Sequence, residues 1–358
     1  IPLAEASSWD PAAVERAAEV SAREAVAAGI RWTFAPMVDI ARDARWGRIA
    51  EGSGEDPYLG SLLAAARVRG FQKSGRMAAC AKHYVGYGAA EGGRDYNATE
   101  MSESTLRDVY LPPFRAAVDA GVYTLMSAFQ TLNGAPTSAN EFTLTKILRG
   151  EWGFHGFVVS DWASISQLQD HGTASSLSDA AEQAFRAGVD MDMQARAYIS
   201  NLASLVRGGK IPAAMLDESV RRILRVKFAS GIFDDPFMKP EEATNLFLSA
   251  ENREAALDVS RKSLVLLKNE GILPFAKTVR SVAVVGPLGD DKKEPLGTWH
   301  CEGRTQDVVS VVAGIRTKLP GAKLVHARGC EITNLSRDSI PAAVSAAKSA
   351  DVVVVVVG

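Results

Sequence analysis

The sequence predicts an α/β protein in which a (β/α)8-type, TIM-like barrel is followed by the start of an α/β sandwich domain. Two observations carry this prediction. Short apolar segments alternate with helix-forming segments over residues 1–229, and polar side chains follow the ends of several apolar segments. Strands that are apolar along their whole length are typical of a parallel sheet covered on both faces.

The expected helices and strands alternate from the start of the chain. Asp10 is a favourable N-cap, Pro11 suits the first helical position, and Gly29 closes the helix. The strands are expected at 30–38, 77–83, 122–129, 156–160 and 188–192, and the further helices at 57–72, 104–120, 143–151, 178–187, 196–207 and 213–229. An open doubly wound sheet has the same pattern as a closed barrel.

The residues at the strand ends separate these two arrangements. Six residues lie at or just after the carboxyl ends of successive expected strands: Arg48, Lys82, His83, Phe129, Asp161 and Asp190. In a barrel these ends meet at one mouth, where barrel enzymes hold their active sites. A crevice in an open sheet would draw on only two or three strands. The barrel is therefore favoured.

The repeating pattern ends near residue 229. Residues 230–262 are interpreted as a linker that ends in a charged helix over 249–262. Residues 263–358 begin a second α/β domain, with strands expected near 282–285, 322–326 and 351–357 and a helix near 307–318. We expect the chain to be incomplete at both ends, because it opens without methionine and stops directly after a strand.

The composition argues against several classes of protein. A net charge of -2 offers no basic face for nucleic acid. The longest apolar run, Val352–Val357, is far shorter than the ~20 residues of a membrane helix. The five histidines and three cysteines have no metal-binding spacing, so no metal or other cofactor is expected. Cys301 and Cys330 are either a disulfide pair or two free thiols.

Seven segments, spread in order over nearly the whole chain, carry a family pattern. They are Phe-Ala-Pro-Met-Val-Asp-Ile-Ala-Arg-Asp-Ala-Arg-Trp-Gly-Arg (34–48), Glu-Asp-Pro-Tyr (55–58), Ala-Lys-His-Tyr (81–84), Met-Ser-Ala-Phe-Gln-Thr-Leu-Asn-Gly (126–134), Gly-Phe-Val-Val-Ser-Asp-Trp (156–162), Ala-Gly-Val-Asp-Met-Asp-Met (187–193) and Leu-Leu-Lys-Asn-Glu-Gly-Ile-Leu-Pro-Phe (266–275). On these segments the chain resembles family 3 glycoside hydrolases. The resemblance implies a β/α barrel and an α/β sandwich with the active site between them, and retaining hydrolysis of β-glycosides.

Asp161 matches the position that the family assigns as the catalytic nucleophile. A retaining glycosidase needs a carboxylate nucleophile and a second carboxyl group about 5–5.5 Å away. Asp161 ends a hydrophobic strand, which would hold it at the mouth, although its position also suits an N-cap of the next helix. The other nearby aspartates match family positions that are not the nucleophile and are interpreted as structural partners: Asp39, Asp190 and Asp192.

The resemblance also implies that four basic residues bind the hydroxyl groups of the sugar: Arg48, Lys82, His83 and Arg94. The forked, permanently charged guanidinium suits a polyol and lowers the pKa of a nearby carboxylate. Arg94 lies in a glycine-rich loop, where a plain surface arginine is the alternative. Neighbouring strand residues point to opposite faces. Lys82 and His83 therefore reach the mouth together only if this alternation is interrupted at the strand end.

Aromatic and apolar side chains complete the expected sugar site. Trp162 directly follows the nucleophile and is a candidate wall for the pyranose ring, whereas Trp299 comes from the second domain and either caps the pocket or packs in a core. Phe129 stands where many relatives carry tyrosine, so another donor or a water is expected to substitute for the lost hydroxyl. Met126 precedes Phe129 on the same strand and is expected on the same face.

The second carboxyl group, the acid/base, is expected beyond Gly358. One branch of the family uses a His-Asp pair in the loop after the Lys-His motif, and that loop has no histidine here. The branch with a second domain uses a glutamate after an early strand of the sandwich, which is about where this chain stops. Glu91 is a nearby carboxyl group but a weaker candidate.

These features predict a retaining, exo-acting β-glucosidase that releases glucose from β-glucosides or from cello- and gluco-oligosaccharides, as in cellulose degradation. We expect it to be periplasmic or secreted, with any signal peptide upstream of Ile1. A homodimer is one possible oligomeric state. β-Xylosidase and exo-β-glucanase are alternatives in the same family. A Schiff-base aldolase using Lys82 would leave Asp161 unexplained, and a non-catalytic sugar-binding protein would need no nucleophile.

Overall fold

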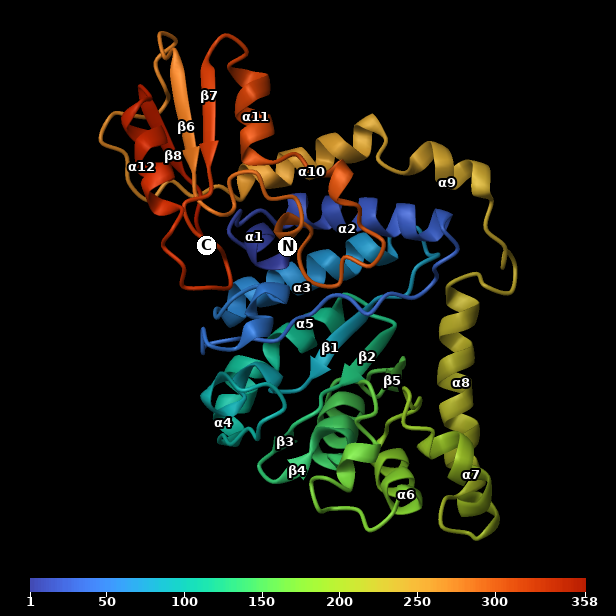
Figure 1. Ribbon diagram of the computed structural model, residues 1–358. Coiled ribbons are helices and arrows are strands. Elements are labelled where there is room, and N and C mark those ends of the chain that lie inside the picture. The colour runs from blue at the N-terminus through green and yellow to red at the C-terminus, as the bar shows by residue number, and fades with distance from the viewer. The chain divides into compact units, whose positions relative to one another are not determined.

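The computed structural model describes residues 1–358, which form two compact units (Figure 1). The larger unit contains Pro2–Leu264, and the smaller contains Val265–Gly358 together with Ile1. Each unit has its own apolar clusters, because each buries the apolar face of a separate parallel sheet.

The sheet of the larger unit is parallel and has the order β1 (Cys80–Tyr84), β2 (Thr124–Ser127), β5 (Phe157–Val159). Three isolated parallel bridges add a further segment at each edge of this sheet: Trp32 to Ala78, Met37 to Lys82 and Val159 to Met191. The five parallel segments coincide with the five predicted barrel strands. The predicted α/β class, with buried parallel strands in the first part of the chain, is confirmed.

Alternate residues of these strands face two different cores. One set forms the interior cluster, together with Val226 of α8 (Ala213–Ala229): Ala78, Cys80, Met126, Phe157 and Val159. The residues between them pack against the surrounding helices: Ala79, Ala81, Leu125 and Val158. Burial on both faces explains why these strands are apolar throughout.

Helices lie side by side on one side of the sheet, where α3 (Pro57–Gln72) packs against both α2 (Pro11–Ala27) and the shorter α5 (Pro112–Asp119) (Figure 1). The Asp10 side chain accepts a hydrogen bond from the Ala13 N–H at 3.0 Å, which confirms the predicted cap. The helix predicted over 104–120 is divided into α4 (Glu103–Thr105), a π-helical turn over Leu106–Tyr110, and α5. Two prolines at the start of α5 explain the division, since proline lacks the N–H of a continuous helix.

Further helices and strands belong to this unit. They are α1 (Pro2–Ala6), the hairpin of β3 (Thr131–Leu132) and β4 (Ala135–Pro136), the π-helical η6 (Phe142–Glu151), α6 (Leu177–Ala187), α7 (Ala197–Arg207), α9 (Pro240–Leu246) and α10 (Ala250–Lys262). Both α9 and α10 lie within the segment interpreted as a linker. α10 packs on α2, where Lys262 forms a 2.9 Å ion pair with Asp10.

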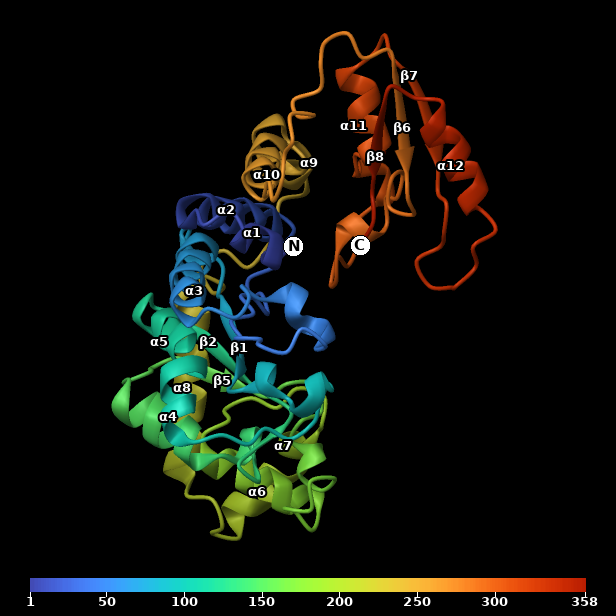
Figure 2. The same cartoon turned by 90° about the vertical axis from the view of Figure 1, so that its left-hand side faces the viewer.

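The smaller unit is a parallel sheet in the order β7 (Lys323–Ala327), β6 (Ser281–Val285), β8 (Val352–Val355). Helix α11 (Val311–Lys318) packs on the face that carries Val282 and Val284, and α12 (Ile340–Lys348) packs on the opposite face (Figure 2). The sequence prediction did not include α12. Successive parallel strands of one sheet need a crossover connection, and α12 supplies it from β7 to β8, which lie on either side of β6.

Candidate active site

The residues predicted to act on a sugar approach one another at the carboxyl ends of the barrel strands. Lys82 and His83 lie on β1, and Asp161 follows β5 by two residues. The pairing of β1 with β2 shifts between Lys82 and Tyr84, so the regular pleat is interrupted where His83 stands. The Lys82 ammonium and the His83 ring both oppose the rise that burial causes in the pKa of Asp161. Both side chains therefore reach the mouth, as expected if the alternation is interrupted at the strand end.

Two loops are held together around these residues. One follows the first strand segment and carries Arg48, and the other follows β1. A side chain at Gly88 would place its Cβ 2.1 Å from the backbone oxygen of Ile40, so only glycine permits this close approach of the loops. The Trp46 Nε1–H donates a hydrogen bond to Asp95 Oδ1 at 3.0 Å and adds a second connection.

His83 lies at the centre of the cluster. Its Nδ1 is 2.8 Å from Asp39 Oδ2, and its Nε2 is 3.0 Å from Arg48 Nη2 and 3.4 Å from Asp161 Oδ2. Burial lowers the pKa of His83 well below its usual value, and the positive charge of Arg48 acts in the same direction. The imidazole is therefore neutral at neutral pH.

The two carboxylate oxygens of Asp161 have different surroundings. Oδ1 accepts a hydrogen bond from the backbone N–H of Trp162 at 2.7 Å, whereas Oδ2 has no hydrogen-bond partner. Burial raises the pKa of Asp161, and His83, the Trp162 N–H and the positive charges of Lys82 and Arg48 oppose this rise. One oxygen is thus fixed by the backbone, and the other faces the basic side chains.

Arg48 is fixed by a carboxylate that the sequence analysis missed. Its Nε and Nη2 donate to the two oxygens of Glu51 at 2.8 Å and 3.0 Å, in the fork geometry that arginine favours. The spacing of three residues between Arg48 and Glu51 was the available signal. Asp39, interpreted from the sequence as a structural partner, is buried and bonds His83 directly.

An aromatic cluster lies beside this network. Phe129 is buried and packs with Trp46 and Tyr87, and the Arg48 guanidinium lies 5.5 Å from the centre of the Tyr87 ring. The exposed ring of Tyr96 packs edge-on against Phe129 with centroids 4.6 Å apart. Burial raises the pKa of Tyr96, and the nearby charges of Asp95 and Asp161 add to this effect. The Tyr96 phenol therefore lies within electrostatic reach of Asp161, which sequence reasoning missed.

The other predicted sugar-binding residues are more dispersed. Arg94 is exposed in the loop after β1, and the Trp162 ring is 60% exposed next to Asp161, so an aromatic face is available there. Met126 is buried in the interior cluster, whereas Phe129 belongs to the Trp46 cluster. The expectation that they share a face is wrong, because β2 ends at Ser127 and its alternation does not continue. Trp299 is exposed and belongs to the smaller unit.

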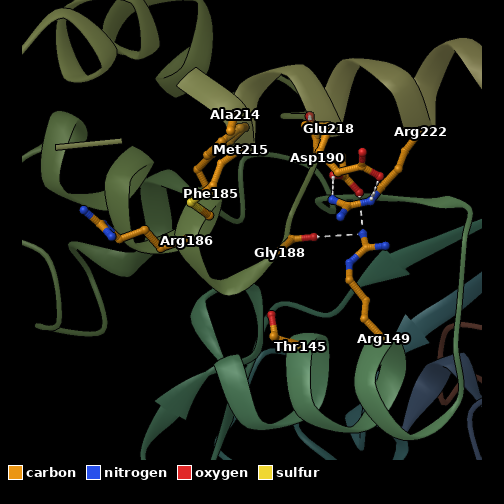
Figure 3. Close-up of a pocket in the computed structure, with 11 residues that line it drawn as sticks. Thr145, Arg149, Phe185, Arg186, Gly188, Asp190, Ala214, Met215, Glu218 and Arg222 are labelled. Carbon is orange, nitrogen blue, oxygen red and sulfur yellow. Dashed lines mark hydrogen bonds and ion pairs between the residues drawn. The ribbon is translucent and has the colours of Figure 1, made fainter. Parts of the chain in front are cut away.

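Asp190 is a structural partner, as interpreted from the sequence, but it does not lie at the mouth, where its strand-end position alone would put it. Its backbone N–H donates to Val158 O, and the next residue takes the interior face, so the Asp190 side chain points outward. Its carboxylate accepts from Arg149 Nη2 at 2.6 Å, Arg222 Nη1 at 3.0 Å and the Val158 N–H at 2.8 Å. Figure 3 shows Arg149 from η6 and Arg222 from α8 converging on Asp190 in a pocket outside the sheet.

Four further expectations from the sequence concern Glu91, metal binding, the cysteines and membrane-spanning helices. Glu91 is exposed, and the structure gives its carboxyl group no bond to the Asp161 cluster. No group of three or more His, Cys, Asp or Glu residues in 1–358 could hold a metal ion. Cys301 and Cys330 are both free thiols. None of the helices combines the length and the apolar character that a membrane crossing requires.

Known proteins match both units. Residues 1–226 match the glycosyl hydrolase family 3 N terminal domain, and residues 264–358 match the glycosyl hydrolase family 3 C-terminal domain. A periplasmic beta-glucosidase of Salmonella typhimurium is 40% identical over 100% of this chain and 51% of its own length. A beta-xylosidase of Formosa agariphila is 38% identical over 99% of this chain and 53% of its own length.

Solved structures agree with these matches. The crystal structure of a beta-glucosidase from Listeria innocua in complex with glucose has a TM-score of 0.93 and 40% identity, covering 99% of this chain and 50% of that one. The chain therefore spans about half the length of the relatives that it matches. The predicted TIM-type barrel followed by the start of an α/β domain is confirmed. Because these matches extend over both units, this chain belongs to glycosyl hydrolase family 3.

Proposed function

We propose that the complete protein is a retaining, exo-acting β-glucosidase in which Asp161 is the nucleophile. The observation that carries this proposal is the unpartnered Oδ2 of Asp161, an oxygen of a buried carboxyl group at the ends of barrel strands. The backbone N–H of Trp162 fixes the other oxygen. A nucleophile needs this combination of a rigid position and a free lone pair.

In the proposed reaction, Asp161 Oδ2 attacks the anomeric carbon as the bond to the glycosidic oxygen breaks. The leaving oxygen takes a proton from a second carboxyl group, which we place beyond Gly358. Water then attacks the anomeric carbon of the glycosyl–Asp161 ester, with the same second group acting as base, and releases glucose with retained configuration. Residues 1–358 thus supply half of the catalytic pair.

Four basic residues are proposed to bind the hydroxyl groups of the sugar: Arg48, Lys82, His83 and Arg94. The fork from Arg48 to Glu51 leaves its Nη1 available, and the positive charge favours the ionised form of Asp161. We propose the exposed ring of Trp162 as the wall for the pyranose face. Met126 and Phe129 would support the site from behind rather than touch the sugar.

Labelling of the complete protein with 2,4-dinitrophenyl 2-deoxy-2-fluoro-β-glucoside tests the assignment. The fluorine slows breakdown of the glycosyl ester, so the label should accumulate on the peptide that contains Asp161. Peptide mapping identifies the site, and Asp56→Ala, at an exposed helix cap of the same unit, is the matched control. A label on another residue, or none on a protein that hydrolyses aryl β-glucosides, would refute the proposal.

A β-xylosidase is the second candidate, supported by the relative from Formosa agariphila. The ratio of kcat/KM for aryl β-glucoside and aryl β-xyloside decides between them, because the substrates differ by one hydroxymethyl group. We further propose a periplasmic or secreted location, supported by the periplasmic relative. Fractionation of the source cells would test it, and activity confined to the cytoplasmic fraction would contradict it.

A further inference from the structure

The position of the ring proton on His83 follows from contacts on both sides of the imidazole. Asp39 Oδ2 lies 2.8 Å from Nδ1 and also accepts the backbone N–H of His83 at 2.9 Å. The side chains of Asp39 and His83 are each 1% exposed, so solvent does not compete for these contacts. An oxygen that already accepts one N–H in this geometry is suited to accept a second.

The opposite side of the ring favours the same tautomer. Arg48 Nη2 lies 3.0 Å from His83 Nε2, and a guanidinium has donors but no acceptor. One hydrogen of Nη2 goes to Glu51, which leaves the other for His83. Nε2 must therefore accept, and a neutral imidazole with an accepting Nε2 carries its proton on Nδ1.

This tautomer affects the proposed nucleophile. His83 Nε2 is only 3.4 Å from Asp161 Oδ2, close enough for a modest shift to create a hydrogen bond. With the proton on Nδ1, Nε2 has nothing to donate, which agrees with the unpartnered state of Oδ2. A proton on Nε2 would instead stabilise the ground-state carboxylate and weaken its attack.

We propose that Asp39 is a positioning residue for formation of the glycosyl–enzyme bond. It accepts the Nδ1 proton of His83 and, together with the Arg48 donor on the other side of the ring, keeps Nε2 from donating to Asp161, so that Oδ2 stays available as the attacking oxygen. This inference rests on the proposed role of Asp161 as nucleophile. Asp39 itself touches neither the sugar nor the reacting atoms.

Neutron diffraction of deuterium-exchanged crystals of the complete protein tests the tautomer without any substitution. We expect deuterium on Nδ1 of His83 and none on Nε2. Deuterium on Nε2 would overturn the proposal, whatever the variants show.

Variants test the consequence for the nucleophile. The dinitrophenyl fluoroglucoside is suited to this test because its phenolate leaves without a proton, so the rate constant of inactivation reports attack by Asp161. Asp39→Ala removes the acceptor and should lower this constant by about 10- to 100-fold, the range expected when a buried donor is left without its acceptor, with little change in the inactivator's binding constant. Asp39→Asn keeps an acceptor oxygen and should restore most of the rate.

Asp56→Ala is the matched control, because one oxygen of Asp56 also accepts two N–H groups, here both from the backbone, at 2.7 Å and 3.0 Å. It should be inactivated at the wild-type rate. A wild-type rate in Asp39→Ala, or an Asp39→Asn variant as slow as Asp39→Ala, would overturn the role of Asp39 while Asp161 still carries the label. Failure of the wild-type protein to be labelled at Asp161 would instead refute the proposed function.

Discussion

Asp161 and Asp190 are two buried aspartates next to neighbouring strand segments of the same barrel, and their surroundings are opposite. Asp190 is paired with Arg149 and Arg222 and accepts a backbone N–H, so both of its oxygens are bonded. Asp161 has a single backbone donor, and its Oδ2 has no hydrogen-bond partner. Asp190 fastens η6 and α8 to the sheet, whereas the incomplete pairing of Asp161 leaves an oxygen for chemistry.

The difference follows from the face on which each side chain lies. Asp190 points outward between helices, where buried charges must be neutralised by partners in the protein. Asp161 points to the strand ends, where a substrate can complete its surroundings. These two buried carboxyl groups of one barrel therefore differ in role, since Asp190 holds the fold together and Asp161 has an oxygen left for chemistry.

The largest effect should come from Asp161→Asn. Removal of the proposed nucleophile should lower kcat of the complete protein by at least about a thousand-fold. The Trp162 N–H keeps an acceptor, and an unpartnered buried charge disappears, so the thermal midpoint should stay the same or rise. Steady-state kinetics and thermal unfolding measure both quantities. A variant that keeps wild-type kcat would contradict the proposed role of Asp161 as the nucleophile.

Asp190→Asn should show the reverse pattern. Loss of the negative charge leaves Arg149 and Arg222 without their counter-ion, which should destabilise the protein by about 3–5 kcal/mol. KM measured well below the unfolding temperature should not change. Asp192→Asn, two residues along the chain with one backbone N–H bond, is the control and should change stability by less than about 1 kcal/mol. Equal destabilisation by both variants would contradict the special role of the Asp190 network.

The sequence was sufficient for the parts of this comparison that depend on local pattern. Apolar strand segments and caps such as Asp10 follow from short-range rules, and the strand-end position of Asp161 follows from them too. The family motif then singled out Asp161. The outward direction of Asp190 was missed because the pleat phase of residues 188–193 depends on the pairing of Met191 with Val159, a tertiary contact.

Other features depend on contacts between distant segments. The bond between Asp39 and His83 joins residues 44 positions apart, and no periodicity in the sequence reveals it. Tyr96 lies in a loop, and its own φ is positive at 67°, a value that tyrosine rarely adopts. The sequence therefore gives no sign that its ring comes near Asp161. Helix α10 was predicted, but its packing on α2 was not, because a charged surface helix gives little sign of its partner.

Arg48 offers a way to sharpen the account of Asp161. Arg48→Lys keeps the charge but loses the fork to Glu51 and the bond to His83, and should lower kcat/KM by about 10- to 100-fold. Arg48→Gln also loses the charge that lowers the pKa of Asp161, so the acid limb of the pH profile should move to higher pH only in this variant. Arg45→Lys, an exposed pair with Asp43, is the control. An unmoved acid limb in Arg48→Gln would show that Arg48 does not act on Asp161.

The smallest effect concerns the stability cost of Asp39. Burial raises the pKa of Asp39 from 3.8 to about 7, so the folded protein retains a proton there that the unfolded chain has released. Its contribution to stability is complete below pH ~4 and is lost as the pH rises through about 7. Asp39→Asn cannot ionise, so it should gain about 2–3 kcal/mol over the wild type between pH 5 and pH 8. Thermal midpoints of both proteins at the two pH values measure this gain. Its absence would mean that Asp39, like Asp190, is fully compensated by its partners.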